Sequence, residues 1–177
     1  CNALLNALQL DSHILRDEPQ ARVGVVAVEL SSLHFRPSAS ADDLRATALF
    51  GDGAVALILG SQPPPRGGLQ VLGFHSQLLP AGQQEMTWQI GDAGFELKLS
   101  SYVPQWIANG MGAHFEALLH QFGLPPEAIN AWAVHPGGPR ILEAVAEYPA
   151  ISIADLAPSY DILRTVGNLS SATLGFL

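Results

Sequence analysis

The apolar positions along this chain follow two patterns: a helical spacing and short continuous runs. Apolar side chains recur every three or four residues along residues 2–16 and again along residues 103–122, as on one face of an α-helix. Pro104 falls in the first turn of the second segment, where the missing N–H is tolerated. We expect the first helix to be buried and to begin at Cys1 or Asn2. Shorter helices are predicted over residues 42–49, 139–147 and 154–165.

Apolar runs between these helices predict strands. Residues 22–33 are rich in Val and Leu and contain no turn residue after Gly24, which is typical of a strand covered on both faces. The sequence Gly51-Asp52-Gly53 predicts a tight turn that opens into a strand. Further strands are expected over residues 54–59, 69–79, 88–99 (one or two strands) and 128–134, and the closing apolar residues 170–177 resemble the middle of another.

Strands that alternate with helices favour an α/β layered fold in which helices cover a mixed sheet. The clearest linker is the stretch SQPPPRGG at residues 61–68, because Pro and Gly interrupt both helices and strands. We therefore predict one unit over residues 1–61, a linker over residues 62–68 and a second unit over residues 69–177.

Composition narrows the function classes. The chain has 177 residues, 48% of them hydrophobic, and a formal net charge of -8 without any run of Lys or Arg. The charge argues against binding of nucleic acid or an anionic membrane. One cysteine cannot form an internal disulfide, and no apolar run is long enough to span a bilayer. We expect a cytoplasmic protein, and the Cys at the start and the apolar residues at the end suggest missing segments at both ends.

Two loops that follow apolar runs carry the candidate chemistry. One presents His135 before Pro-Gly-Gly, and the other presents Asn168 after Gly167. An imidazole and a carboxamide placed in this way bind the oxygen of a thioester and stabilise an enolate, provided that a nucleophile lies nearby. The only cysteine is Cys1.

Three segments carry a family resemblance: LFGDGAVALILGS (49–61), WAVHPGGPRIL (132–142) and VGNLSSATL (166–174). They resemble, in order and spacing, signature regions of type III polyketide synthases, the chalcone and stilbene synthase-like enzymes of the thiolase superfamily. The resemblance covers nearly the whole chain but only about the second half of a typical member. It implies a thiolase-like layered fold with mixed sheets covered by helices, comprising the end of the N-terminal half and most of the C-terminal half.

The resemblance also implies an acyltransferase that decarboxylates malonyl-CoA and condenses it with a cysteine-bound acyl starter. Cys1 would be the nucleophile, at the N-terminus of a helix whose dipole favours the thiolate. His135 would lower the pKa of that thiol and contact the substrate carbonyl, and Asn168 would stabilise the enolate. CoA thioesters are substrates in this chemistry, so the resemblance implies no cofactor and no metal. It implies malonyl-CoA and an acyl-CoA starter as partners, and a homodimer in the full-length form.

The same resemblance assigns substrate-binding positions. Phe50 matches an aromatic gatekeeper between the CoA tunnel and the reaction cavity. Two positions depart from plant members: His34 replaces a small polar residue, and Leu97 replaces a second gatekeeper phenylalanine. These changes favour an aliphatic acyl-CoA starter, as in bacterial members similar to alkylresorcinol or alkylpyrone synthases. The full set of expected substrate-binding residues is Phe50, His34, Leu97, Gly137, Gly138 and Ser170.

Alternatives remain open at this point. A condensing enzyme similar to ketoacyl-ACP synthase III would also use Cys, His and Asn. A non-catalytic split or degenerate half would only pack against a partner. An N-terminal nucleophile hydrolase would use Cys1 with its own α-amine, but that class needs the nucleophile to open a strand, and residues 2–10 are helix-like. We expect residues 1–177 alone to be inactive.

Overall fold

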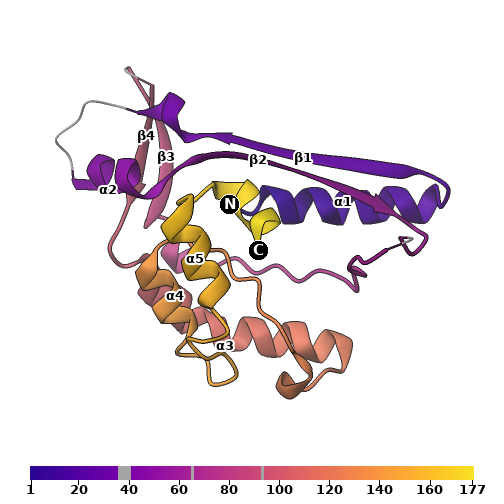
Figure 1. Cartoon of the computed structure of the whole chain (residues 1–177). Coiled ribbons are helices and arrows are strands. Elements are labelled where there is room, and N and C mark those ends of the chain that lie inside the picture. The colour runs from indigo at the N-terminus through magenta and orange to yellow at the C-terminus, as the bar shows by residue number, and fades with distance from the viewer. Residues whose placement is uncertain (36–40, 65, 93) are drawn as a thin grey trace.

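A computed structural model describes residues 1–35, 41–64, 66–92 and 94–177 of the chain. Its longest sheet is an antiparallel ladder of β1 (Arg22–Leu30) and β2 (Asp52–Gly60), paired from Arg22↔Gly60 to Leu30↔Asp52. Helix α1 (Ala3–Asp17) lies along this ladder, and the two ends of the chain lie side by side at the start of α1 (Figure 1). The ladder and α1 therefore place residue 1 beside the last residues of the chain.

The ladder is covered on one face only among the described residues. Burial alternates along both strands: Val25 is 7% exposed, whereas Val26 and Ile58 are 68% and 80% exposed. The prediction that residues 22–33 form a strand covered on both faces is wrong here, because α1 packs against one side and residues 31–34 turn into a short 3-10 helix, η1 (Ser31–His34). The expected tight turn at Gly51-Asp52-Gly53 is also wrong, since β2 already begins at Asp52.

A hairpin forms the second sheet. Its strands are β3 (Met86–Gly91) and β4 (Gly94–Leu99), which confirms the strands expected over residues 88–99. Helix α2 (Ala41–Leu49) packs against β4 and confirms the helix expected over residues 42–49.

Three further helices form a core of their own below the ladder (Figure 1). They are α3 (Val103–Phe122), α4 (Pro139–Val145) and α5 (Ala157–Thr165), close to the predicted bounds. Helix α3 ends at Gly123, whose φ of 62° is the left-handed conformation that glycine adopts without strain. The core comprises four buried side chains, and each contributes on the order of 1.5–3 kcal/mol of hydrophobic burial: Leu142, Val145, Ile151 and Leu156.

Three expected strands do not form among the described residues. Residues 69–79 and 128–134 lack regular structure apart from short 3-10 turns at their borders, and the end of the chain forms a 3-10 helix, η4 (Ser170–Phe176). A strand needs a hydrogen-bonded neighbour, and no described segment pairs with these three. The expected linker at 62–68 has no helix or strand at 62–64 and 66–68, and Pro65 lies outside the described residues. Of the helices described, none combines the length and the apolar character that a bilayer crossing demands.

Candidate active site

Cys1 stands just before α1 and faces the end of the chain. Its thiol is free and exposed, and its Sγ lies 3.8 Å from the hydroxyl oxygen of Ser170 in η4. The first turn of α1 contains no acidic residue. The structure therefore brings the predicted nucleophile to one of the predicted substrate-binding residues.

His135 is a largely buried imidazole without a partner. Neither ring nitrogen is accessible to solvent or hydrogen-bonded to any residue that the structure describes. Burial is the main cause that lowers the pKa of His135 to about 4. At neutral pH the ring is therefore uncharged, with one nitrogen that donates and one that accepts a hydrogen bond. Buried polar atoms are rarely left unpaired, so this ring is suited to meeting a ligand.

The segment that leads to His135 is anchored to α5. The hydroxyl of Ser159, which is fully buried, donates a hydrogen bond of 2.7 Å to the carbonyl oxygen of Val134. On the other side, the N–H of Gly137 donates to the carbonyl of His135 at 2.9 Å. The backbone of His135 is thus held from both sides while its ring stays free.

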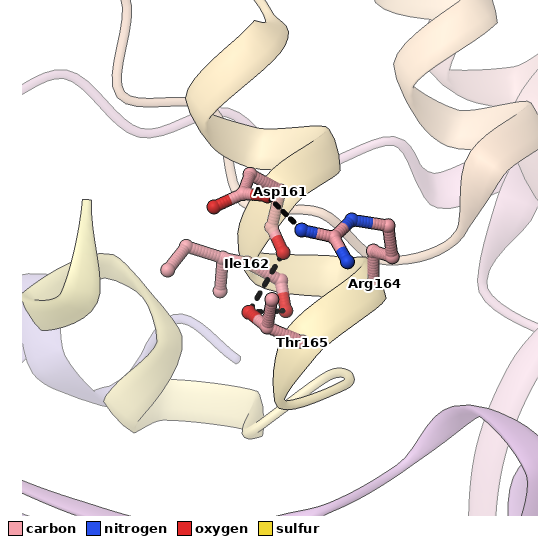
Figure 2. Close-up of polar contacts among 4 residues, drawn as sticks. All are labelled: Asp161, Ile162, Arg164 and Thr165. Carbon is pink, nitrogen blue, oxygen red and sulfur yellow. Dashed lines mark hydrogen bonds and ion pairs between the residues drawn. The ribbon is translucent and has the colours of Figure 1, made fainter.

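Asn168 lies on the loop that follows α5. In the last turns of that helix, Thr165 donates its hydroxyl to the carbonyl of Asp161 at 2.7 Å, and Arg164 pairs with the Asp161 carboxylate at 2.6 Å (Figure 2). Both partners of the ion pair are exposed, so it contributes little to stability. The chain then turns at Gly167, with a φ of 82° in the left-handed region, and enters the loop.

Backbone hydrogen bonds join this loop to the residues around Phe50. The N–H of Asn168 donates to the carbonyl of Leu49 at 2.9 Å, and the N–H of Gly51 donates to the carbonyl of Asn168 at 3.0 Å. Phe50 and Asn168 form an isolated parallel bridge. The side-chain oxygen of Asn168 accepts the N–H of Ser170 at 2.8 Å. Its NH₂ group is therefore the end of the amide that remains to donate to a ligand.

A carboxylate that the sequence did not single out holds the same loop. Glu29 on β1 accepts hydrogen bonds from the N–H of Ser171, at 3.1 Å, and from its hydroxyl. Glu29 is the only charged residue between Val23 and Leu30, and a lone carboxylate in an apolar strand is a signal that could have been used. It positions η4 against the ladder.

A cavity of about 870 Å³ opens beside Cys1. Of the expected substrate-binding residues, it is lined by Phe50, His34, Leu97 and Ser170. Four expected site residues are not part of its lining: His135, Asn168, Gly137 and Gly138. Asn168 is connected to this lining by the hydrogen bond to Ser170 and by the bridge to Phe50.

Trp88 and Phe95, which the sequence did not indicate, line this cavity together with His34. The ring of His34 lies 5.5 Å from that of Trp88 and 5.6 Å from that of Phe95, between centroids. We call these three residues the aromatic wall. No group of three or more His, Cys, Asp or Glu side chains that could hold a metal ion occurs within residues 1–35, 41–64, 66–92 and 94–177.

These parts suit chemistry on a thioester. A thiol is the usual nucleophile for acyl transfer, a neutral imidazole donates a hydrogen bond without carrying a charge, and an amide NH₂ stabilises a developing oxyanion. The cavity supplies room for an acyl group beside the thiol.

Comparison with known proteins gives two family matches. The model of the chalcone and stilbene synthase N-terminal domain matches residues 1–63, and that of the C-terminal domain matches residues 70–177. The α-pyrone synthesis polyketide synthase-like Pks18 of Mycobacterium tuberculosis is 32% identical over the whole chain, which covers 46% of Pks18. The 1,3,6,8-tetrahydroxynaphthalene synthase of Streptomyces peucetius subsp. caesius is 33% identical over 90% of this chain and 43% of its own length.

A solved structure shares the fold. The crystal structure of PKS-I from the brown alga Ectocarpus siliculosus superposes with a TM-score of 0.91 at 27% identity, over 98% of this chain and 47% of that one. The prediction of an α/β thiolase-like fold, present in part, is thereby confirmed. The chain spans about half the length of the curated relatives it matches.

Proposed function

The chain belongs to the chalcone and stilbene synthase family, and from this premise we propose that it carries the condensing site of a type III polyketide synthase. The reaction is the extension of an acyl group by the two-carbon unit of malonyl-CoA. CoA thioesters are its substrates, and it uses no further cofactor and no metal.

The proposed steps balance as follows. The thiolate of Cys1 attacks the carbonyl carbon of an acyl-CoA, forms a new thioester and releases the CoA thiolate, which takes up a proton. Malonyl-CoA then loses carbon dioxide, and the electron pair of the broken carbon–carbon bond becomes an enolate. The enolate attacks the Cys1 thioester and expels the thiolate. His135 and Asn168 donate hydrogen bonds to the thioester oxygen and stabilise the enolate.

The observation that carries this proposal is the unpaired, uncharged ring of His135. Both of its nitrogens are buried without a partner among the described residues, and burial is the main cause that lowers its pKa to about 4. A charged imidazolium would give its proton to the enolate and quench it, whereas a neutral N–H polarises the carbonyl without that loss. A ring held neutral by burial suits the decarboxylation of malonyl-CoA.

The cavity supports an aliphatic starter. Much of its lining is apolar, with Leu30, Phe35, Met86 and Leu97 beside the aromatic residues. Apolar side chains bury the methylene groups of an acyl chain at about 0.8 kcal/mol for each. We propose a fatty acyl-CoA as the starter, and a homodimer in the cytoplasm as the working form.

The test uses the protein expressed from its complete gene, with malonyl-CoA labelled at its free carboxyl carbon. The unmodified protein should release labelled carbon dioxide and extend an acyl-CoA. Cys1→Ala should abolish extension, and His135→Gln should lower it by at least about 100-fold, as for loss of an oxyanion donor. His120→Gln, which changes an exposed histidine on α3, is the control and should retain full activity. Full product formation by His135→Gln would refute the proposal. We expect residues 1–177 alone to be inactive.

A further inference from the structure

The first residue of β2 holds the turn that follows β1. Ser32 in η1 donates its backbone N–H to Oδ1 of Asp52 at 2.8 Å and its hydroxyl to Oδ2 at 2.5 Å. The hydroxyl and the N–H of Ser32 lower the pKa of the Asp52 carboxyl, so the acceptor is an anion at neutral pH and both bonds are charge-assisted. Leu30 and Asp52 are partners in the ladder, which fixes where this carboxylate stands.

The turn held in this way carries His34 into the aromatic wall. His34 is the last residue of η1, two positions after Ser32. Trp88 and Phe95 come from the two strands of the β3–β4 hairpin, and their own rings meet edge to face at 6.2 Å. Aromatic pairs at these separations prefer tilted and edge-on geometries, so the three rings form one contact between η1 and the hairpin.

The wall and Cys1 border the same cavity. An acyl group attached to the Cys1 sulfur extends into that space, and the length that fits depends on the position of the aromatic wall. The position of His34 is set by the two bonds from Ser32 to Asp52, because η1 is a single short turn.

From this geometry we propose that Asp52 is a positioning residue that limits the length of the acyl group on Cys1, by holding η1 and His34 in the aromatic wall. The proposal rests on the proposed function for its acyl substrate. It concerns loading of Cys1 by acyl-CoA and not the decarboxylation of malonyl-CoA, so the two can fail separately.

The chain offers a matched control in a second Ser–Asp pair. Asp155 accepts the N–H of Ser152 at 2.8 Å and its hydroxyl at 2.6 Å, and these bonds lower the pKa of the Asp155 carboxyl as well. This second Ser–Asp pair precedes α5 and is not part of the cavity lining. Asp155→Ala therefore removes the same two bonds without touching the wall.

The first measurement follows the His34 ring directly. With ¹³C-labelled histidine, the ring currents of Trp88 and Phe95 displace the His34 signal, which His34→Gln assigns by its loss. In Asp52→Ala the signal should move to the position of a histidine without neighbouring aromatic rings, and in Asp155→Ala it should stay. An unchanged His34 signal in Asp52→Ala would show that the carboxylate does not place the ring, and the proposal would fall.

The second measurement compares the rates at which long and short saturated acyl-CoAs load Cys1, followed by the mass of the acylated protein. In Asp52→Ala the ratio of the loading rate of the long acyl-CoA to that of the short one should rise about tenfold, as for a pocket that gains room for a methylene group. Trp88→Ala should raise it similarly, and the double variant should add nothing further, because both act through one wall.

A His34 ring that moves while the ratio stays constant would overturn the limit on length, even if the protein condenses malonyl-CoA. A changed ratio of loading rates in a protein that fails to release carbon dioxide would instead support the role of Asp52 and the aromatic wall, and would refute the proposed function. Loading by neither acyl-CoA, in a folded protein, would refute both.

Discussion

Acidification from pH 7 to pH 4 should destabilise the folded chain through His135. The ordinary pKa of a histidine is 6.5, and burial is the main cause that lowers the pKa of His135 to about 4. Between these values the unfolded chain binds a proton that the folded chain does not, so acid favours unfolding. The stabilisation is complete above pH 6.5 and is lost as the pH falls toward 4. The difference of about 2.5 pH units, at 1.36 kcal/mol for each, corresponds to about 3 kcal/mol.

Urea unfolding of the protein and of His135→Gln at pH 7, 5.5 and 4 isolates this contribution. Glutamine is polar and uncharged at every pH, and the other titrating groups cancel in the difference between the two proteins. The free energy of unfolding of the unmodified protein should fall relative to the variant by about 3 kcal/mol across the range. A difference that stays constant within about 0.5 kcal/mol, the usual limit of additivity, would show that His135 is not buried as a neutral ring.

Two further outcomes are expected. Gly51→Ala should lower the free energy of unfolding by about 1–3 kcal/mol, because the new methyl group would overlap the carbonyl oxygen of Val166. Gly24→Ala on β1 is the control, since its methyl group meets no other atom. Equal losses of the two variants in urea unfolding would contradict this prediction. Ser159→Ala should cost about 1–3 kcal/mol in the same assay by leaving a buried carbonyl unpaired, and a loss below about 0.5 kcal/mol would contradict it.

Local sequence signals predicted the bounds of the helices well. The expectation that the first helix is buried is wrong among the described residues, because only Leu4, Asp11 and Leu15 of α1 are buried. Helix α3 has the predicted bounds, because Pro104 favours its first turn and Gly123 adopts the left-handed conformation that ends it. The β3–β4 hairpin was also expected from its apolar residues. These elements close their hydrogen bonds within a short stretch of chain, so the information that specifies them is local.

The strands expected over residues 69–79 and 128–134 do not form, because a strand depends on a partner that is not local in sequence. An apolar run shows that a segment prefers burial, but a strand also needs a partner beside it. The described residues supply that partner for β1 and β2, which pair along nine residues each, and not for these two segments. In the second segment Trp132 packs against the helical core, whereas Leu69, Leu72 and Leu78 of the first segment are exposed.

The candidate site also combines residues that the sequence predicted with contacts that it did not. The motifs indicated Cys1, His135 and Asn168, but no motif connects Asp52 with Ser32 or Glu29 with Ser171. These pairs are 20 and 142 residues apart in sequence and form only because the β1–β2 ladder places their carboxylates beside η1 and η4. A carboxylate in an apolar strand can be noticed in the sequence, whereas its partner depends on the fold.

The GDG and GNLSS segments are best understood as one structural unit. Two backbone hydrogen bonds join Asn168 to Leu49 and Gly51 across more than a hundred residues, and Phe50 stands between those two bonds. A side chain at Gly167 would lie 3.0 Å from the Leu49 carbonyl, so glycine permits the approach as well as the turn. The backbones of Phe50 and Asn168 are therefore tied together. A substitution that shifts residues 49–51 should displace the Asn168 amide as well as the side chain of Phe50, which lines the cavity.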